Sequence, residues 1–196
     1  MTHTLEKSAI DQYLVYHGLT WEKFKLIQSG FAGASGVRLF YYDGTLEILM
    51  PGREHEIFSR LICYFVMTFF LEKGIEFEPT GSMTQEAPDV ASAQADESFC
   101  IGGAKPTPDL SIEVVFTSGG ASKLARYQAL RVPEVWFWED GVFTLYHLRG
   151  DRYDLIQQSE IPELQDLDLA LLTRCVLLAQ TDKAEAVRVF RREIQK

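Results

Sequence analysis

The strand that organises the predicted fold lies in residues 106–117, PTPDLSIEVVFT. Side chains of a β-strand alternate between its two faces with a period of two. One face of this strand is entirely apolar, and it consists of Leu110, Ile112, Val114 and Phe116. The other face carries two carboxylates, Asp109 and Glu113, together with Ser111, Val115 and Thr117. Such carboxylates belong either to a solvated surface or to the edge of a metal site.

The spacing of these two carboxylates prevents them from sharing one ion on a regular strand. Asp109 and Glu113 are four residues apart, or roughly 13 Å at about 3.3 Å per residue. A metal bound by Glu113 therefore needs a carboxylate from a neighbouring strand, where opposed side chains lie about 5 Å apart. The preceding strand, residues 96–101, directs Asp96 to one side and Phe99 to the other. If the two strands pair, Asp96 and Glu113 can reach one hard divalent cation.

The flanking segments predict an α/β fold. Helices are expected at residues 20–29, with Thr20 as N-cap, at 54–73, at about 122–131 and from about 182. Residues 37–49 predict a hairpin that turns at Asp43-Gly44. Strands are expected at 75–85, 96–101 and 109–117, and three more lie between residues 132 and 156. The order helix, three strands, helix, strand favours helices packed on a mixed sheet.

Length and composition indicate one domain. The chain has 196 residues, of which 46% are hydrophobic and 24% charged, without repeats or long linkers. We expect a single domain over residues 1–196, with an N-terminal extension at 1–19 and a C-terminal helix at 182–196. The longest apolar run is too short to span a bilayer, and no signal peptide is visible. Three widely spaced cysteines indicate reduced thiols, so we expect a cytoplasmic protein without a membrane partner.

The formal net charge of −9 argues against a general nucleic-acid-binding surface, although it allows a local one. An excess of carboxylates also suits a divalent-metal site. The sequence contains no phosphate-binding P-loop, dinucleotide-binding glycine motif, nucleophile elbow or zinc motif. Composition and the absence of these motifs therefore exclude several classes of protein, but they do not select one function.

An ordered set of segments resembles the Uma-type restriction endonucleases, a family of the PD-(D/E)XK nuclease superfamily. YYDGTLEILMPGREHE (41–56) is similar to the family's first hairpin and helix start, and ADESFCIGG (95–103) to its first acidic strand. Residues 106–148 resemble its core, including a Lys-x-x-x-Tyr helix and a Val-Pro-Glu-Val-Trp strand. The resemblance runs from about residue 20 to 178, and the ordered set is more specific than any single piece.

The resemblance implies a restriction-endonuclease-like core, in which a mixed β-sheet is flanked by helices. It implies an endonuclease that uses Mg²⁺ or Mn²⁺ to hydrolyse phosphodiester bonds in DNA, with Asp96 and Glu113 as metal ligands. Asp109 is a further candidate for the metal or its surroundings. Glu47 and His55 are candidates for an accessory group near the first long helix.

One position departs from the superfamily pattern, which has a lysine two residues after Glu113 where this chain has Val115. A lysine there polarises the attacking water or stabilises the charge of the phosphorane. Lys123 is the candidate replacement, because it lies in the first turn of the next helix and its long side chain can reach back. Lysine at a helix start opposes the helix dipole, which favours a functional role. The same relocation is typical of the family that the chain resembles.

Each candidate also has a purely structural interpretation. Asp96 could open its strand as a turn residue, Glu47 could point outward, and His55 could cap a helix. Glu113 is harder to explain in this way, because a lone buried carboxylate among apolar neighbours is costly. Tyr127 is interpreted as a packing residue. Basic residues near the C-terminus are interpreted as a solvated face, namely Arg188, Arg191 and Arg192.

The leading prediction is a metal-dependent DNA endonuclease. Its alternative is a catalytically silent domain of the same fold that serves as a binding or assembly module, which the negative charge and the missing strand lysine favour. A third hypothesis is a homodimer formed through the apolar face of the C-terminal helix, with Val187, Phe190 and Ile194.

Overall fold

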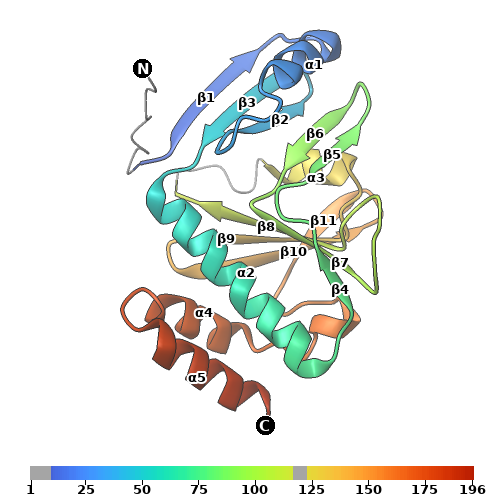
Figure 1. Cartoon of the computed structure of the whole chain (residues 1–196). Coiled ribbons are helices and arrows are strands. Elements are labelled where there is room, and N and C mark those ends of the chain that lie inside the picture. Colours follow the sequence, from blue (N-terminus) through green and yellow to red (C-terminus); the bar gives the residue numbers. More distant parts are fainter. Residues whose placement is uncertain (1–9, 117–122) are drawn as a thin grey trace.

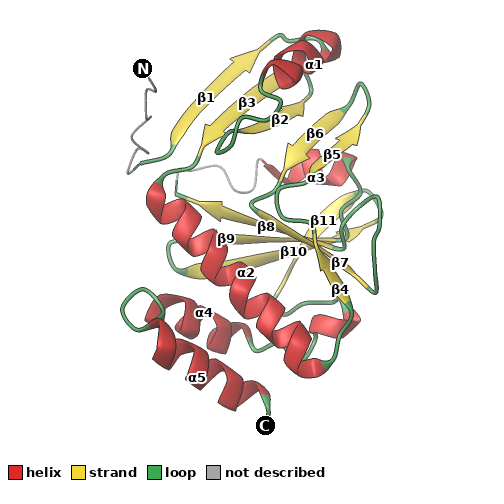
Figure 2. Ribbon diagram, in the orientation of Figure 1, coloured by secondary structure: helices red, strands yellow, loops and turns green. Residues whose placement is uncertain are grey.

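The computed structural model describes residues 10–116 and 123–196, which form two β-sheets and the helices packed around them (Figures 1 and 2). The long helix α2 (Arg53–Lys73) begins beneath one sheet and crosses a face of the other. Helices α4 (Leu169–Leu178) and α5 (Lys183–Ile194) pack beside α2. The predicted mixed α/β fold with flanking helices is confirmed.

The five-stranded sheet is antiparallel and has the order β1-β3-β2-β6-β5. Its strands are β1 (Gln12–His17), β2 (Arg38–Tyr42), β3 (Thr45–Met50), β5 (Thr84–Ala87) and β6 (Ala91–Gln94). The predicted hairpin is confirmed as β2 and β3, and Asp43 and Gly44 between them both adopt positive φ angles. Residues 12–17, assigned above to an N-terminal extension, form the edge strand β1.

Helix α1 (Trp21–Gly30) packs on this sheet and begins where the sequence predicts. Thr20 is its N-cap, and the Thr20 side chain accepts a hydrogen bond from the backbone N–H of Lys23. The aromatic rings of Trp21 and Phe24 contact Tyr41 of β2. This packing gives the five-stranded sheet an apolar layer of its own.

The six-stranded sheet is mixed and has the order β11-β10-β9-β8-β7-β4. Its strands are β4 (Phe77–Pro79), β7 (Glu97–Ile101), β8 (Leu110–Val115), β9 (Glu134–Glu139), β10 (Val142–Arg149) and β11 (Arg152–Ile156). Strands β8 and β9 are parallel and are joined through the short helix α3 (Leu124–Ala129), while the other pairs are antiparallel. Thr117 and Ser122, at the predicted ends of strand and helix, lie outside the described residues.

The predicted strand at residues 75–85 is wrong, because this segment is divided between the two sheets. Its first part is β4, which pairs with β7. A turn at Thr80–Met83 then redirects the chain into β5 of the other sheet, and β6 returns it towards β7. The hairpin β5–β6 is therefore inserted within the order α2, β4, β7, β8, α3, β9, which otherwise matches the predicted order.

Strand β8 is buried on both faces. Leu110, Ile112 and Val114 pack in the main core with α2, β9 and the C-terminal helices. Val115 packs in a second cluster that includes Tyr127 of α3 and Phe40 of β2. The polar face of this strand is therefore not a solvated surface, and Glu113 lies fully buried on it.

The C-terminal helix belongs to the main core, contrary to the hypothesis that its apolar face is chiefly a partner surface. Phe190 is fully buried, and its ring centroid lies 4.9 Å from that of Phe65 in α2. Ile194 is also buried in the same cluster. The short 3₁₀ helix at Pro162–Leu164 leads into α4 and adds Leu164 to this core. No helix in the described part of the chain is long and apolar enough to cross a membrane.

Candidate active site

The first candidate ligands, Asp96 and Glu113, are brought together by the pairing of β7 with β8. In the register of this pair, Glu97 lies opposite Ile112. One residue further along, Asp96 therefore lies opposite Glu113. The Oδ2 atom of Asp96 accepts a hydrogen bond of 2.6 Å from the backbone N–H of Val114. Both carboxylates are buried. The strand pairing expected for these two acids is therefore present.

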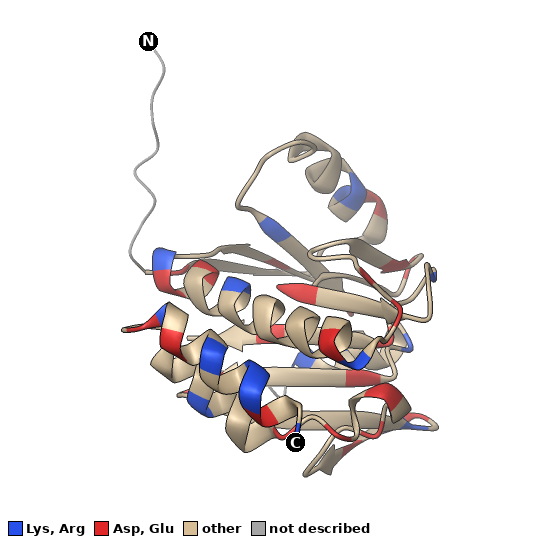
Figure 3. Cartoon of the chain, turned by 60° about the horizontal axis from the view of Figure 1, so that its bottom comes forward, with Lys and Arg blue, Asp and Glu red and all other residues tan. Residues whose placement is uncertain are grey.

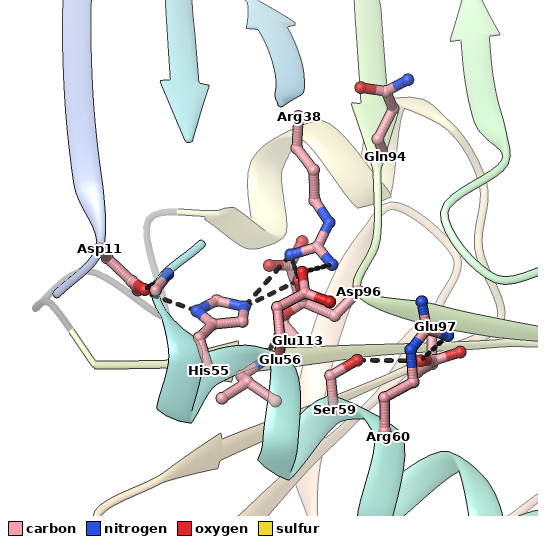
Figure 4. A network of polar contacts seen from close by, with 12 residues as sticks. Asp11, Arg38, His55, Glu56, Ser59, Arg60, Gln94, Asp96, Glu97 and Glu113 are labelled. Atoms are coloured by element: carbon pink, nitrogen blue, oxygen red, sulfur yellow. Dashed lines mark hydrogen bonds and ion pairs between the residues drawn. The ribbon is translucent and has the colours of Figure 1, made fainter. Parts of the chain in front are cut away.

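Two cationic side chains face the carboxylate of Asp96 (Figure 4). Arg38 of β2 forms an ion pair with Asp96 Oδ1, and His55 of α2 places Nε2 2.9 Å from the same oxygen. Burial by itself raises the pKa of Asp96, but Arg38, His55 and the N–H of Val114 outweigh it and hold the pKa below its ordinary value. Asp96 is thus a carboxylate at neutral pH.

His55 links Asp96 to Asp11, the residue that precedes β1 of the five-stranded sheet. Its Nδ1 lies 2.8 Å from Oδ2 of Asp11, whose Oδ1 accepts a hydrogen bond of 2.7 Å from the N–H of Gly52. Burial lowers the pKa of His55, but its bonds to Asp11 and Asp96 raise it to about 9. His55 is therefore an imidazolium at neutral pH, and both ring N–H groups donate to carboxylates.

Helix α3 supplies the partners of Glu113. Lys123, at the N-cap of α3, places Nζ 3.3 Å from Oε2 of Glu113, and the hydroxyl of Tyr127 donates to Oε1. Burial and the nearby Glu113 carboxylate raise the pKa of Tyr127 well above its ordinary value, so it remains a donor. Tyr127 does pack in the second cluster as predicted, but it also anchors Glu113.

Glu47 lies in the same region without touching Asp96 or Glu113. It projects from β3 and accepts a hydrogen bond of 2.7 Å from Nη1 of Arg126 in α3. Burial raises the pKa of Glu47, but Arg126, Tyr13 and Lys123 outweigh it and lower the pKa. Glu47 therefore lies at the rim of a buried charged cluster and is connected to it through Arg126. This cluster, called the cluster below, consists of Asp11, Arg38, Glu47, His55, Asp96, Glu113, Lys123, Arg126 and Tyr127.

Asp109 is not brought to the other candidates. It immediately precedes β8, four residues before Glu113. Its Oδ2 accepts a hydrogen bond of 2.7 Å from the N–H of Ile101, and both carboxylate oxygens lie within 2.8 Å of Nζ of Lys105. These contacts fasten the loop between β7 and β8. The geometry gives Asp109 a structural position, because strand spacing separates it from the Asp96–Glu113 pair.

The donor chemistry of Asp96 and Glu113 fits a hard divalent cation. Mg²⁺ and Mn²⁺ prefer oxygen ligands, and Mg²⁺ is commonly held by one or two carboxylates together with water. All four carboxylate oxygens already face a cation or a hydrogen-bond donor, so an ion would have to displace some of these partners. Among the described residues, no group of three or more His, Cys, Asp or Glu side chains is arranged to hold a metal.

Three residues of this network were missed from the sequence: Asp11, Arg38 and Arg126. Arg126 had a usable signal, because Lys123, Arg126 and Tyr127 follow the spacing i, i+3, i+4 and so share one face of a helix. Arg38 and Asp11 had none, since they lie far from Asp96 in sequence. Only the packing of the two sheets brings them to it.

The chain matches the model of a known protein family. The model of the Uma2 family, described as "Putative restriction endonuclease", matches residues 21–179. This range contains α1 through α4 and every residue of the cluster except Asp11. No curated protein matches the chain significantly.

Proposed function

Because the chain belongs to the Uma2 family of restriction-endonuclease-like proteins, we propose that it is a metal-dependent endonuclease that hydrolyses phosphodiester bonds in DNA. The observation that supports this proposal is the convergence of two buried carboxylates, Asp96 and Glu113, from adjacent strands of the core sheet. Packing alone gives no reason to bury two acids side by side, since this costs free energy unless cations compensate. The nuclease pattern that the chain resembles places such a pair at its metal.

In this proposal Asp96 and Glu113 hold Mg²⁺ or Mn²⁺. When bound, such an ion activates water and neutralises charge on the phosphate. Tyr127 orients Glu113 through its hydroxyl, and His55 orients Asp96 through Nε2. Lys123 takes the position of the missing strand lysine, with its ammonium beside Glu113 and available to a water or a phosphate oxygen.

Plasmid nicking tests the proposal directly. Supercoiled DNA is incubated with the metal-stripped protein and either Mg²⁺, Mn²⁺ or EDTA, and nicked product is quantified on gels. We expect cleavage with a metal and none with EDTA. The substitutions Glu113→Gln and Asp96→Asn should each reduce the rate at least about a hundredfold, because each removes a carboxylate ligand.

Glu97→Gln is the matched control. Glu97 is adjacent to Asp96 and equally buried, but its carboxylate accepts hydrogen bonds from Ser59 and Arg60 instead of facing the cluster. This variant should retain wild-type nicking per folded molecule. Thermal unfolding of all three variants shows whether they fold. Cleavage that survives both Glu113→Gln and Asp96→Asn would refute the proposed site.

A catalytically silent module is the second candidate, and one observation favours it. The carboxylates of the cluster already have cationic partners, since Asp96, Asp11, Glu113 and Glu47 contact Arg38, His55, Lys123 and Arg126, respectively. Calorimetry distinguishes the two candidates. An endonuclease should bind Mn²⁺ in a way that Glu113→Gln abolishes, whereas a silent module should bind none.

The cellular setting forms part of the same proposal. We place the enzyme in the cytoplasm as a homodimer acting on DNA, and the three described cysteines, Cys63, Cys100 and Cys175, are free thiols. Sedimentation equilibrium of the full chain tests the homodimer. A monomer mass at concentrations that support nicking would contradict it.

A further inference from the structure

Arg126 is one of two buried arginines of this cluster that the sequence did not single out. It lies in α3, three residues after Lys123, and its side chain is 3% exposed. Its guanidinium carbon lies 4.0 Å from the centroid of the Phe40 ring, and Nη1 donates to Glu47 at 2.7 Å. The ring and the carboxylate together hold the guanidinium plane in one orientation.

The guanidinium of Arg126 keeps donors that the described residues do not satisfy. Nε and Nη2 are both buried and have no hydrogen-bond partner in the described part of the chain. Buried donors without partners cost free energy and are rare in native proteins. The guanidinium therefore has two donors that an acceptor from outside this network would satisfy.

Two other cations near the carboxylates are more fully engaged. His55 contacts both Asp11 and Asp96, and Arg38 contacts both Asp96 and Glu56. A cavity of about 210 Å³ reaches Arg126, and it is lined by Tyr42, Asp43, Thr45, Glu47 and Arg126. Glu47 is paired with Arg126 itself, and Asp43 adds a second carboxylate to the lining, so the guanidinium has room for a single acceptor oxygen and not for a polyanion.

We propose that Arg126 binds a non-bridging oxygen of the substrate phosphodiester through the Nε and Nη2 donors. In the superfamily pattern a strand lysine two residues after the glutamate supplies positive charge, and here that position is Val115, buried in the second cluster. Arg126 projects from α3 within electrostatic reach of Glu113. This inference rests on the proposed phosphodiesterase function, which it deepens by naming the residue that contacts the phosphate.

Arginine side-chain NMR tests the contact without any turnover. Protein with ¹⁵N-labelled arginine is titrated with dimethyl phosphate, at constant ionic strength set with chloride, once with Mg²⁺ and once with EDTA. The buried Nε–H of Arg126 should give a protected signal, which is assigned by its loss in Arg126→Lys. We expect this signal to shift saturably in at least one condition, while the signal of Arg131, paired with exposed Asp151, stays in place. A signal of Arg126 that does not move in either condition overturns the proposal.

Kinetics provide the second readout. Arg126→Lys keeps the charge beside Glu47 but removes the planar pair of donors, so it should fold like the wild type. It should lower kcat/KM for DNA about ten- to hundredfold, as expected for a charged hydrogen bond. The control Arg131→Lys should leave kcat/KM unchanged. Wild-type kinetics in Arg126→Lys would show that Arg126 only supports Glu47.

The two readouts separate this inference from the proposed function. If the chain has no nuclease activity but the Arg126 signal responds to dimethyl phosphate, the phosphate contact stands and the endonuclease proposal fails. If the chain cleaves DNA through Glu113 but Arg126 neither shifts nor affects kcat/KM, the endonuclease proposal stands and the contact is refuted.

Discussion

Individual charged residues in this protein are positioned by opposite charges in a buried setting. Asp11, His55 and Asp96 form a row of alternating charge that connects the residue before β1, the first turn of α2 and the residue before β7. Ion pairs of this kind are costly to break on one side, because the remaining partner is left charged and buried. Substituting one of these three residues should therefore change the free energy of unfolding through the lost charge more than through the lost volume.

Asp11→Asn should destabilise the protein in a pH-dependent way. Burial raises the pKa of Asp11, but the bonds to His55 and to the N–H of Gly52 lower it below its ordinary value. A depressed folded-state pKa contributes stability above the unfolded pKa of about 4, and this contribution is lost as the pH falls through the folded value. At pH 7 we expect a loss of about 1.5–3 kcal/mol in the free energy of unfolding.

Urea unfolding of wild type and Asp11→Asn at several pH values between 2.5 and about 7 measures this effect. The difference between the two proteins should be constant near neutrality and should shrink below about pH 4. A difference that stays the same down to pH 2.5 would show that the Asp11 charge contributes nothing.

Asp109→Ala should affect stability and leave catalysis intact. The substitution leaves the N–H of Ile101 and the ammonium of Lys105 without their acceptor. We expect a loss of about 1–3 kcal/mol in the free energy of unfolding, with unchanged nicking per folded molecule. Loss of nicking in a folded Asp109→Ala protein would instead return Asp109 to the metal site.

Elements in this fold serve the site through the surfaces that they bury. Strand β8 contributes Leu110, Ile112 and Val114 to the core and Glu113 to the cluster, because its faces alternate. Helix α2 similarly combines His55 at its start with Phe65 and Phe69 further along. The C-terminal helix α5 contributes no residue to the cluster, yet it completes the core against α2.

Phe190→Ala tests the contribution of α5. Removing a fully buried ring in contact with Phe65 should cost about 3–5 kcal/mol in the free energy of unfolding. Urea denaturation is the measurement. Arg188→Ala on the same helix, where Arg188 is exposed and paired with Glu185, should change stability by less than about 0.5 kcal/mol. Equal effects of the two substitutions would contradict the observed packing.

The whole molecule carries a formal net charge of −9. Along α5, basic residues are interspersed with acidic ones (Figure 3). Arg188, Arg191 and Arg192, predicted to form a solvated face, pair with Glu185, Glu72 and Glu193. A surface of this kind attracts DNA weakly, since non-specific affinity depends on unpaired Lys and Arg contacts to phosphate. Affinity should therefore depend on the ion that we propose at Asp96 and Glu113.

Fluorescence anisotropy of a labelled duplex tests this dependence on the metal. With EDTA at about 150 mM salt, we expect a dissociation constant weaker than about 10⁻⁵ M, within the non-specific range. Adding Ca²⁺, a hard cation of the same ligand preference, should strengthen binding for wild type and not for Glu113→Gln. Binding that is equally tight with EDTA would place the DNA affinity elsewhere on the surface.

Local patterns were sufficient to predict much of the fold. The hairpin at Asp43-Gly44, the Thr20 cap, α2 and the β7–β8 pairing were all predicted, because each depends on turn residues, periodicity or neighbouring strands. The division of residues 75–85 between two sheets was not predictable in this way. Alternation specifies a strand, whereas its partner is decided by long-range packing.

The sequence by itself determined the Asp96–Glu113 pair, because the strand period and the order of strands leave few arrangements for two acids on neighbouring strands. It also pointed to Lys123 as the cation beside Glu113. Only the tertiary structure decided the remaining partners. Arg38 reaches Asp96, and Asp11 reaches His55, because the five-stranded sheet packs over the core. It also moved Asp109 out of the cluster and brought Arg126 into it. Buried charges select their partners by distance in space, and a linear pattern does not contain that distance.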